Sequence, residues 1–234
     1  MLCSLARLSL LLICSILATA TYAQIVTVPT DLVPGDKYRL AFVTRDLTPA
    51  LSTDIATYDA FVTAQADEMT ELLDLQTAWR VIGSTPTISA KFHTGTDNTA
   101  PGVNGVPIYR LDGKLIATDY DDLWDGSIQN PIQIAQDGSL VVSWGSWTGT
   151  YTFGKAIPGD ELGASDLTVV DGAPFGTGPN WIETGAFGAV NPQHLYGISD
   201  VLTVPDPTID VAIDIRPGSD SVCNSTIPVA VLGS

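Results

Sequence analysis

Four aspartates lie close together near the middle of the chain and could hold a cation. They are Asp119, Asp121, Asp122 and Asp125, in the stretch DYDDLWD. Carboxylate oxygens are preferred ligands of Ca²⁺, and loops rich in aspartate supply them. The stretch lacks the spacing of a calcium loop, which needs a glycine at a sharp bend and a glutamate at the twelfth position. Calcium is therefore the one cofactor that the sequence suggests, without a motif to support it.

The same aspartates also fit a structural role. Asp119 and Asp122 would stand in the first turn of a short helix, where carboxylates face the positive end of the helix dipole. This interpretation needs no metal ion, and the residue pattern favours it over a metal site.

Other side chains with catalytic potential are scattered. His93 and His194 lie far apart, and neither has a second histidine at metal-ligand spacing. We expect His93 to be exposed in a loop rich in glycine and threonine. The sequence contains no Ser/His/Asp order, no Cys/His pair and no phosphate loop, so we predict no catalytic residues and no enzyme. The alternative is an extracellular hydrolase that uses the acidic stretch 119–125.

The charge balance excludes some partners. Asp and Glu number 26 against 10 Lys and Arg, and the formal net charge is −16. No basic patch is present to neutralise phosphates, which argues against nucleic acid and against an anionic membrane surface. The acidity is typical of a soluble protein outside the cell.

The first 23 residues have the pattern of a signal peptide. Arg7 precedes an apolar run over residues 8–20, and the run is too short to span a bilayer. We predict cleavage after Ala23, with cleavage after Ala20 as the alternative. No later stretch is long and apolar enough for a membrane span. The protein is therefore expected to be secreted or extracellular.

Removal of the signal peptide leaves Cys223 as the one cysteine of the mature chain. A single cysteine cannot form an internal disulfide, so the fold must rest on its apolar core. Cys223 could pair two chains, and the oligomeric state is left open.

Alternating and helical patterns predict the elements of the main domain. In residues 37–45, Tyr38, Leu40 and Phe42 would lie on one face and the residues between them on the other. This period of two indicates a β-strand. Asp54 can cap a helix, and apolar residues then recur at spacings of three and four up to residue 75. We therefore predict one long helix, from about residue 54 to 75, packed on a sheet.

The remaining patterns divide the chain into units. Further strands are expected over residues 78–84, 106–110, 114–117 and 194–204, with loops over 85–105 and 151–178. A linker at 205–209, containing two prolines, separates a different unit at 210–234. That unit contains two predicted strands, too few to be stable alone. We expect a signal peptide at 1–23, a main domain at 24–204, and a partial β module at 210–234.

The main domain resembles a domain of unknown function from exported bacterial proteins, often ones with a PEP-CTERM sorting tail. The resemblance covers about three quarters of the chain and rests on VPGDKYRLAFVT, WRVIGS, VPIYRLDG, LWDGS, WTGT and LYGIS. The order of these segments is also similar to endostatin-like members of the C-type-lectin-like fold. This similarity implies an α+β domain with one long helix on an antiparallel sheet and long loops. The disulfides, calcium and sugar ligands, zinc histidines and sorting tail of those families are absent here.

The C-terminal unit resembles a second module of secreted bacterial and archaeal proteins. VAIDIRPGSD and IPVAVLGS are similar to its IDIKPGS and IPVAILGS segments, and the usual continuation is missing. Together the patterns predict a secreted or cell-surface binding domain, without enzymatic activity, for a protein or glycan at the cell surface. A structural component of an envelope or matrix is a further alternative.

Overall fold

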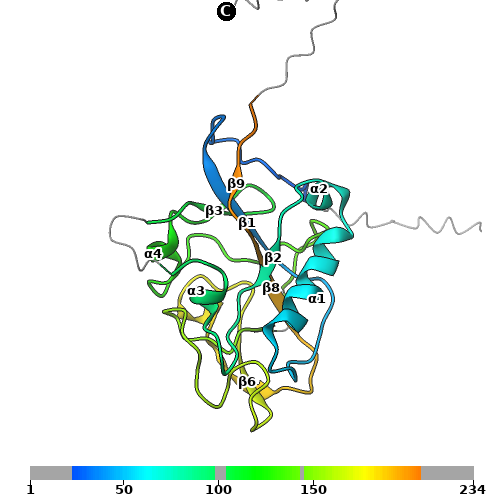
Figure 1. Ribbon diagram of the computed structural model, residues 1–234, viewed down its shortest axis with the longest axis vertical. Coiled ribbons are helices and arrows are strands. Elements are labelled where there is room, and N and C mark those ends of the chain that lie inside the picture. The colour runs from blue at the N-terminus through cyan, green and yellow to red at the C-terminus, as the bar shows by residue number, and fades with distance from the viewer. Residues whose placement is uncertain (1–22, 98–103, 143–144, 207–234) are drawn as a thin grey trace, which may run out of the picture.

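The computed structural model describes residues 23–97, 104–142 and 145–206 (Figure 1). These residues contain nine strands: β1 (Lys37–Val43), β2 (Trp79–Val81), β3 (Ile108–Arg110), β4 (Leu115–Ala117), β5 (Ser146–Trp147), β6 (Thr168–Gly172), β7 (Gly185–Gly188), β8 (His194–Ser199) and β9 (Leu202–Thr203). The helices are α1 (Ile55–Asp67), α2 (Thr70–Leu73), α3 (Ala90–His93) and α4 (Tyr120–Leu123), with a short 3₁₀ helix η1 (Pro179–Trp181). None of the helices in this part of the chain has the length and apolar character needed to cross a membrane.

The strands form one mixed sheet. Its order is β4-β3-β1-β8-β5-β6-β7, with β2 also paired to β8 and β9 also paired to β1. The pairs β1–β3 and β5–β8 are parallel, and the other pairs are antiparallel. The strands β1 and β8 lie at the centre, where residues far apart in the sequence come together (Figure 1).

The predicted first strand is confirmed as β1, and it separates two hydrophobic clusters. Successive side chains of a strand point to opposite faces of the sheet. Leu40 and Phe42 belong to one cluster, and Ala41 and Val43 belong to the other. Both faces of β1 are therefore buried. A surface strand would alternate buried apolar and exposed polar side chains, and β1 does not.

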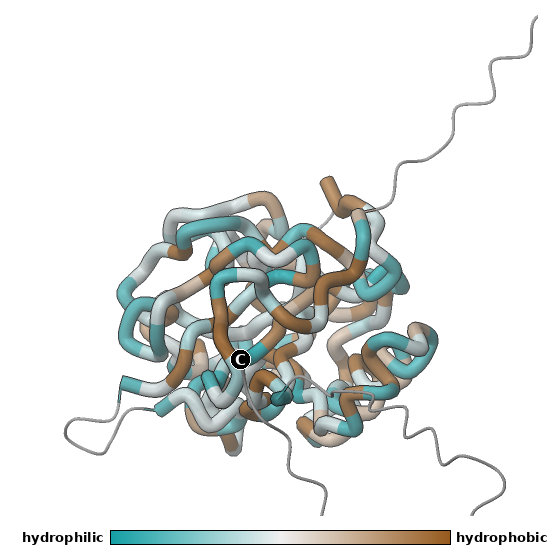
Figure 2. The backbone as a smooth tube through the Cα atoms, turned by 90° about the horizontal axis from the view of Figure 1, so that it is seen from above, coloured by the Kyte–Doolittle hydropathy of each residue, from teal (hydrophilic) through white to brown (hydrophobic). Residues whose placement is uncertain are grey.

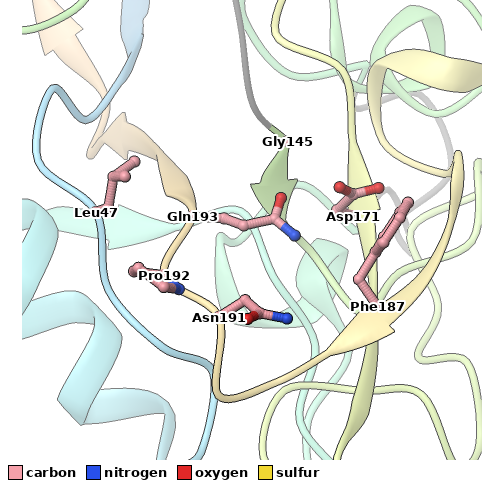
Figure 3. Close-up of a pocket in the computed structure, with 7 residues that line it drawn as sticks. All are labelled: Leu47, Gly145, Asp171, Phe187, Asn191, Pro192 and Gln193. Atoms are coloured by element: carbon pink, nitrogen blue, oxygen red, sulfur yellow. The ribbon is translucent and has the colours of Figure 1, made fainter.

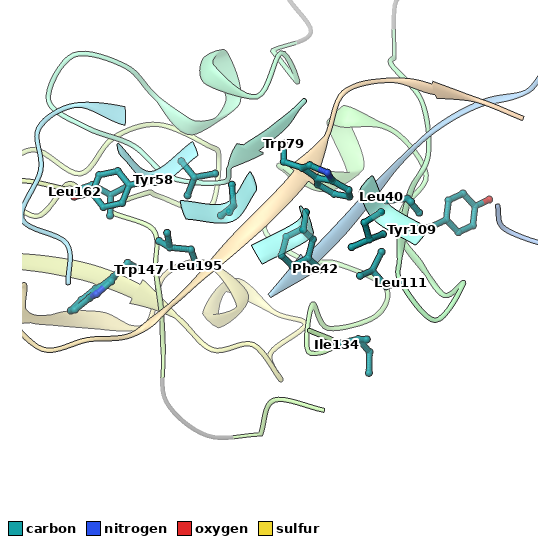
Figure 4. Packing of buried hydrophobic residues seen from close by; sticks show 14 of the residues in the cluster. Leu40, Phe42, Tyr58, Trp79, Tyr109, Leu111, Ile134, Trp147, Leu162 and Leu195 are labelled. Atoms are coloured by element: carbon teal, nitrogen blue, oxygen red, sulfur yellow. The ribbon is translucent and has the colours of Figure 1, made fainter. Parts of the chain in front are cut away.

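Helix α1 covers the first cluster. Tyr58 and Val62 of α1 belong to the same cluster as Phe42 and as Trp79 of β2; in Figure 4 Trp79 lies beside Phe42, and Tyr58 lies beside Leu162. The rings of Phe42 and Trp79 meet edge to face with centroids 5.1 Å apart, which is the preferred arrangement for aromatic pairs. Trp79 of the predicted strand 78–84 points inward and is buried.

The opposite face is covered by loops and short elements in place of a second long helix. Its cluster includes Ile116 of β4, Leu123 of α4 and Trp181 of η1. Hydrophobic and hydrophilic residues are mixed along the same backbone segments throughout the molecule (Figure 2). Irregular segments can thus bury some side chains while exposing their neighbours.

The expected fold, one long helix on an antiparallel sheet, was wrong. The sheet is mixed, and the long helix is interrupted: α1 ends at Asp67, Met69 is extended, and α2 adds one further turn. The side chains of Gln65, Glu68 and Gln136 hydrogen-bond one another at this break. Because apolar residues continue at spacings of three and four across Met69, the sequence pattern did not reveal the interruption. The start of the helix was predicted correctly, since Asp54 caps α1 by accepting the amide of Ala56.

Three strands were missed: β5 lies outside every predicted strand, and β6 and β7 lie in or after a segment that was predicted to be loops. Glycines on both sides of β6 obscured its short apolar run. The predicted signal peptide up to residue 22, residues 143–144, the linker residues 207–209 and the module at 210–234 lie outside the described residues.

Candidate functional site

Three of the four aspartates of the acidic stretch accept hydrogen bonds in local turns. Asp119 caps α4 by accepting the amide of Asp122 at 2.9 Å. Asp125 accepts the amide and the hydroxyl of Ser127, at 2.9 and 3.1 Å. Asp121 is exposed in the first turn of α4. These contacts are the ones expected of carboxylates at the start of a short helix.

Asp122 is held most firmly of the four. Its Oδ2 accepts the amide of Thr118 at 2.6 Å and the side-chain amide of Gln129 at 3.0 Å. Burial pushes the pKa of Asp122 upward, but these hydrogen bonds outweigh burial and leave the pKa below its ordinary value. In residues 23–97, 104–142 and 145–206, no group of three or more His, Cys, Asp or Glu is arranged to hold a metal ion. Calcium at this stretch stays a prediction from the sequence.

The histidine that was expected to be exposed is buried. His93 ends α3, and its Nε2 lies 2.8 Å from Oδ1 of Asp59 on α1. The same carboxylate oxygen accepts the amide of Val81 on β2 at 2.9 Å. The pair therefore joins two helices to a strand, which is a structural task.

A first concave region, of about 450 Å³, surrounds Arg39 and Arg80. The Nε of Arg39 donates to the carbonyl of Ser199 at 2.6 Å, and its Nη1 donates to the carbonyl of Thr94 at 2.7 Å. Asp200 pairs with Arg80 at 3.1 Å. Burial lowers the pKa of Arg39. Its guanidinium donors bind backbone carbonyls of two separate segments. The charged groups in this region therefore stabilise the fold.

A second concave region has polar groups that the fold does not use fully. This pocket has a volume of about 550 Å³, and we call it the Asp171 pocket. Its lining residues are Leu47, Gly145, Asp171, Phe187, Asn191, Pro192 and Gln193 (Figure 3). Asp171 and Phe187 stand on one side, Leu47 and Pro192 on the other, and the Gln193 side chain reaches between them toward Gly145 (Figure 3).

Four separate segments build the Asp171 pocket, because its lining comes from Leu47, Gly145, Asp171 and residues 187–193. Asp171 belongs to β6, which pairs with β7 so that Asp171 stands opposite Gly185. The segment before β8 is held to the segment after β1 by two backbone hydrogen bonds between Thr48 and Gln193, at 2.8 and 3.1 Å. The pocket therefore depends on tertiary pairing and has no continuous motif.

Asp171 is a buried carboxyl without a cationic partner. It is 5% exposed, and none of the ion pairs among the described residues includes it. The hydroxyl of Thr184 donates to its Oδ1. Burial raises the pKa of Asp171, and the hydrogen bonds from Thr184 and Gln193 offset this only in part.

Two buried oxygens next to Asp171 have no hydrogen-bond donor. Oε1 of Gln193 and Oγ of Ser146 are buried without a partner among the described residues. A Cβ atom placed on Gly145 would overlap both Oδ2 of Asp171 and Oε1 of Gln193. Oδ2 of Asp171 and Oε1 of Gln193 thus lie against the same face of Gly145, close to each other. Buried polar atoms are nearly always paired, and an unpaired one suggests a missing ligand, ion or water.

Few sequence features pointed to these residues. Asp171 lies in the segment 151–178 that was predicted to be loops, and Gln193 had no pattern around it. The one local signal was an aspartate that directly follows two valines in the run TVVDG, where a strand would place its side chain in the interior.

No known protein-family model matches the chain. No curated protein of known sequence matches it either.

Proposed function

We propose that this protein is an exported binding domain, without enzymatic activity, that holds a ligand in the Asp171 pocket. The observation that carries this proposal is the unpaired Oε1 of Gln193 beside the buried carboxyl of Asp171. A carboxyl that is buried without a cation is costly for the fold, and such costs are concentrated where a protein binds or reacts.

The shape and lining of the pocket support binding. A volume of about 550 Å³ lies within the usual range for small-molecule sites, roughly 300–1,000 Å³. Leu47, Phe187 and Pro192 give apolar walls, and Asp171 and Gln193 give a small polar floor. Sites of this composition take up an apolar body and orient it with a few polar contacts.

Catalysis has less support at this site. Asp171 is the one titratable side chain among the described lining residues. Acid–base or nucleophilic chemistry needs at least a second positioned group, such as a base beside a nucleophile. The hydrolase alternative placed its chemistry at residues 119–125, whose carboxylates cap a helix and close turns.

Export is supported by the sequence pattern of residues 1–23 and by the excess of acidic residues. The partner would then be met outside the cell, as a protein or a glycan at a cell surface. The resemblance to exported bacterial domains is in keeping with this setting. A purely structural envelope component has no need of an unpaired acceptor in a pocket, and it is the less favoured alternative.

The test is a fragment screen by two-dimensional NMR on the processed chain, with neutral, acidic and basic fragments. At least one fragment is expected to shift the amide signals of Asp171, Phe187 and Gln193 along one saturation curve. Gly145→Ala should abolish that binding, because a new methyl group would displace both floor oxygens. Where this variant disturbs the spectrum globally, Phe187→Ala at the mouth replaces it.

Gly178→Ala is the matched control. A Cβ at position 178 meets only Asn180 Oδ1, at 3.7 Å, so this variant should keep the binding. If no fragment saturates signals around Asp171, or if those that do bind equally well to Gly145→Ala, the proposed function is wrong.

A further inference from the structure

We propose that the ligand group that enters the Asp171 pocket is a primary ammonium at the end of an apolar chain. This inference rests on the proposed function of the pocket and names the chemistry of its ligand. A free alkylamine and a lysine side chain of a partner protein share this chemistry. The recognising atoms would be Oδ2 of Asp171 and Oε1 of Gln193.

The first argument is that one acceptor in the floor of the pocket lacks a donor, although the Gln193 side chain also hydrogen-bonds Asp171. Oε1 of Gln193 has no donor, and Oδ2 of Asp171 lies beside it over Gly145. A carboxylate and an amide oxygen that approach each other repel unless a hydrogen atom lies between them. An ammonium group carries three donors and no acceptor, so it can bond to both oxygens at once.

The second argument is charge. The side chain of Asp171 is buried and lacks an ion pair within the described residues. Unpaired buried charge is expensive, and a cation that arrives with the ligand removes this cost. The upward shift of the Asp171 pKa through burial is the shift that a bound cation would reverse. The net charge of −16 favours the approach of a cation over that of an anion.

The third argument is the wall of the pocket. Phe187 and Leu47 are 49% and 37% exposed, which is high for large apolar side chains, and Pro192 completes the wall. An alkyl chain would cover this exposed apolar surface, at a gain of roughly 25 cal/mol for each Å² removed from water. The face of the Phe187 ring would also attract a nearby cation.

Other ligand classes fit less well. A divalent cation such as Ca²⁺ takes six to eight oxygen ligands, and the described lining supplies one carboxylate. A neutral sugar hydroxyl could donate to Gln193 Oε1, but it would leave the charge of Asp171 uncompensated. An anion would meet two acceptors and no cation.

The test is a titration of the processed chain with three six-carbon probes: n-hexylammonium chloride, 1-hexanol and hexanoate. Isothermal calorimetry and amide shifts of Asp171 and Gln193 report affinity and location. The ammonium is expected to bind at least about tenfold more tightly than the alcohol, as the loss of a charged hydrogen bond predicts. Hexanoate is expected to bind most weakly.

Two variants connect the preference to the floor of the pocket. Asp171→Asn should reduce n-hexylammonium affinity about tenfold or more and leave hexanol affinity unchanged, because the wall is intact. Asp166→Asn, at an exposed turn residue, is the matched control and should change neither. Phe187→Ala should weaken both probes, whereas Phe175→Ala, at an equally exposed phenylalanine outside the pocket, should weaken neither.

The two sources of the amine are separated in a second arm. Acetyl-Gly-Lys-Gly-amide is compared with the same peptide acetylated on Nε, which loses its charge. Preference for the free lysine peptide over n-hexylammonium assigns the pocket to a lysine of a protein partner. Preference for n-hexylammonium assigns it to a free amine.

Equal binding of alcohol and ammonium, or ammonium binding that survives Asp171→Asn, would overturn the inference. Binding of a neutral monosaccharide at the same residues, without ammonium binding, would also overturn it and would leave the proposed function intact. If no class of fragment binds at this pocket, the proposed function itself is wrong.

Discussion

Oδ2 of Asp171 and Oε1 of Gln193 lie against the same face of Gly145, although β6 carries the first residue and the segment before β8 carries the second. Two acceptors are thereby brought together in a buried position without a donor for the amide oxygen. The fold tolerates this arrangement, and its cost leads to the first prediction.

Asp171→Asn is expected to stabilise the protein at neutral pH. The asparagine can still accept the Thr184 hydroxyl and can also donate to the unpaired Oε1 of Gln193. One recovered hydrogen bond contributes about 1 kcal/mol, which corresponds to a rise of roughly 2–4 °C in melting temperature for a domain of this size. Thermal unfolding by circular dichroism measures the change, and an unchanged or lower melting temperature at pH 7 would contradict it.

The pH dependence of that difference follows from the raised pKa of Asp171. A carboxyl with a raised pKa in the folded state contributes stability that is fully present below its unfolded pKa, about 3.9. This contribution is lost as the pH rises through the folded pKa. The advantage of Asp171→Asn over the wild type should therefore grow from pH 4 toward pH 7, and a constant difference would count against the assignment.

Asp112→Asn is expected to destabilise the protein. Asp112 forms a two-point pair with Arg110, at 2.7 and 2.6 Å, and the Arg110 side chain is 3% exposed. Loss of one partner of a buried pair costs about 3–5 kcal/mol, and partial solvent access of Asp112 reduces the expected loss to about 2–3 kcal/mol. Asp46→Asn is the matched control, because its pair with Arg45 is 3.9 Å long and exposed. Urea unfolding compares the two variants.

The stability that Asp112 contributes should also disappear in acid. Burial pushes the pKa of Asp112 upward, but its hydrogen bonds to Arg110 outweigh burial, and the pKa is lowered. A carboxyl with a lowered pKa contributes stability above its unfolded pKa, and this is lost as the pH falls through the folded pKa. The stability gap between the wild type and Asp112→Asn should therefore begin to narrow below about pH 4. A gap that stays constant as the pH falls from 7 to 2 would show that the variant acts by another route.

Asp122→Asn tests the calcium prediction. Asp122 holds the turn between β4 and α4 through Thr118 and Gln129, so its loss should cost about 1 kcal/mol. If the role is structural, this cost is the same in EDTA and in millimolar Ca²⁺, and the wild-type melt does not respond to calcium. A wild-type melting temperature that rises with Ca²⁺, and does so less in Asp122→Asn, would establish the metal site.

The predicted cleavage of the N-terminal segment is testable by intact mass spectrometry of the purified protein. The amide of Ala23 donates to the carbonyl of Gly138 at 2.9 Å, and Ala23 packs against the first hydrophobic cluster. Cleavage after Ala20 would keep these contacts in the mature chain, and cleavage after Ala23 would remove them. These contacts favour cleavage after Ala20 over cleavage after Ala23, which the sequence pattern had favoured. We therefore expect an N-terminus at Thr21. A mass that begins at Gln24 would contradict this expectation.

Local sequence patterns determined many of the elements correctly. The alternation around Leu40 predicted β1, the carboxylate of Asp54 predicted the start of α1, and Asp119 predicted the start of α4. The predicted strands 106–110 and 114–117 are joined by a tight turn in which Gly113 has a φ of +80°, which glycine adopts without strain. These features depend on hydrogen bonds and dihedral angles within a few residues, so the sequence alone specifies them.

Only the tertiary structure decided how the elements pair and where the pocket lies. The parallel pairing of β1 with β3 joins segments about seventy residues apart, and no local pattern encodes strand order. Apolar spacing continued across Met69, where packing and the Gln65–Glu68–Gln136 contacts end the helix. Asp171 and Gln193 carry no motif, because their role arises from burial and from proximity to Gly145. Burial and long-range contact are properties of the folded chain, and they give these two ordinary residues their chemistry.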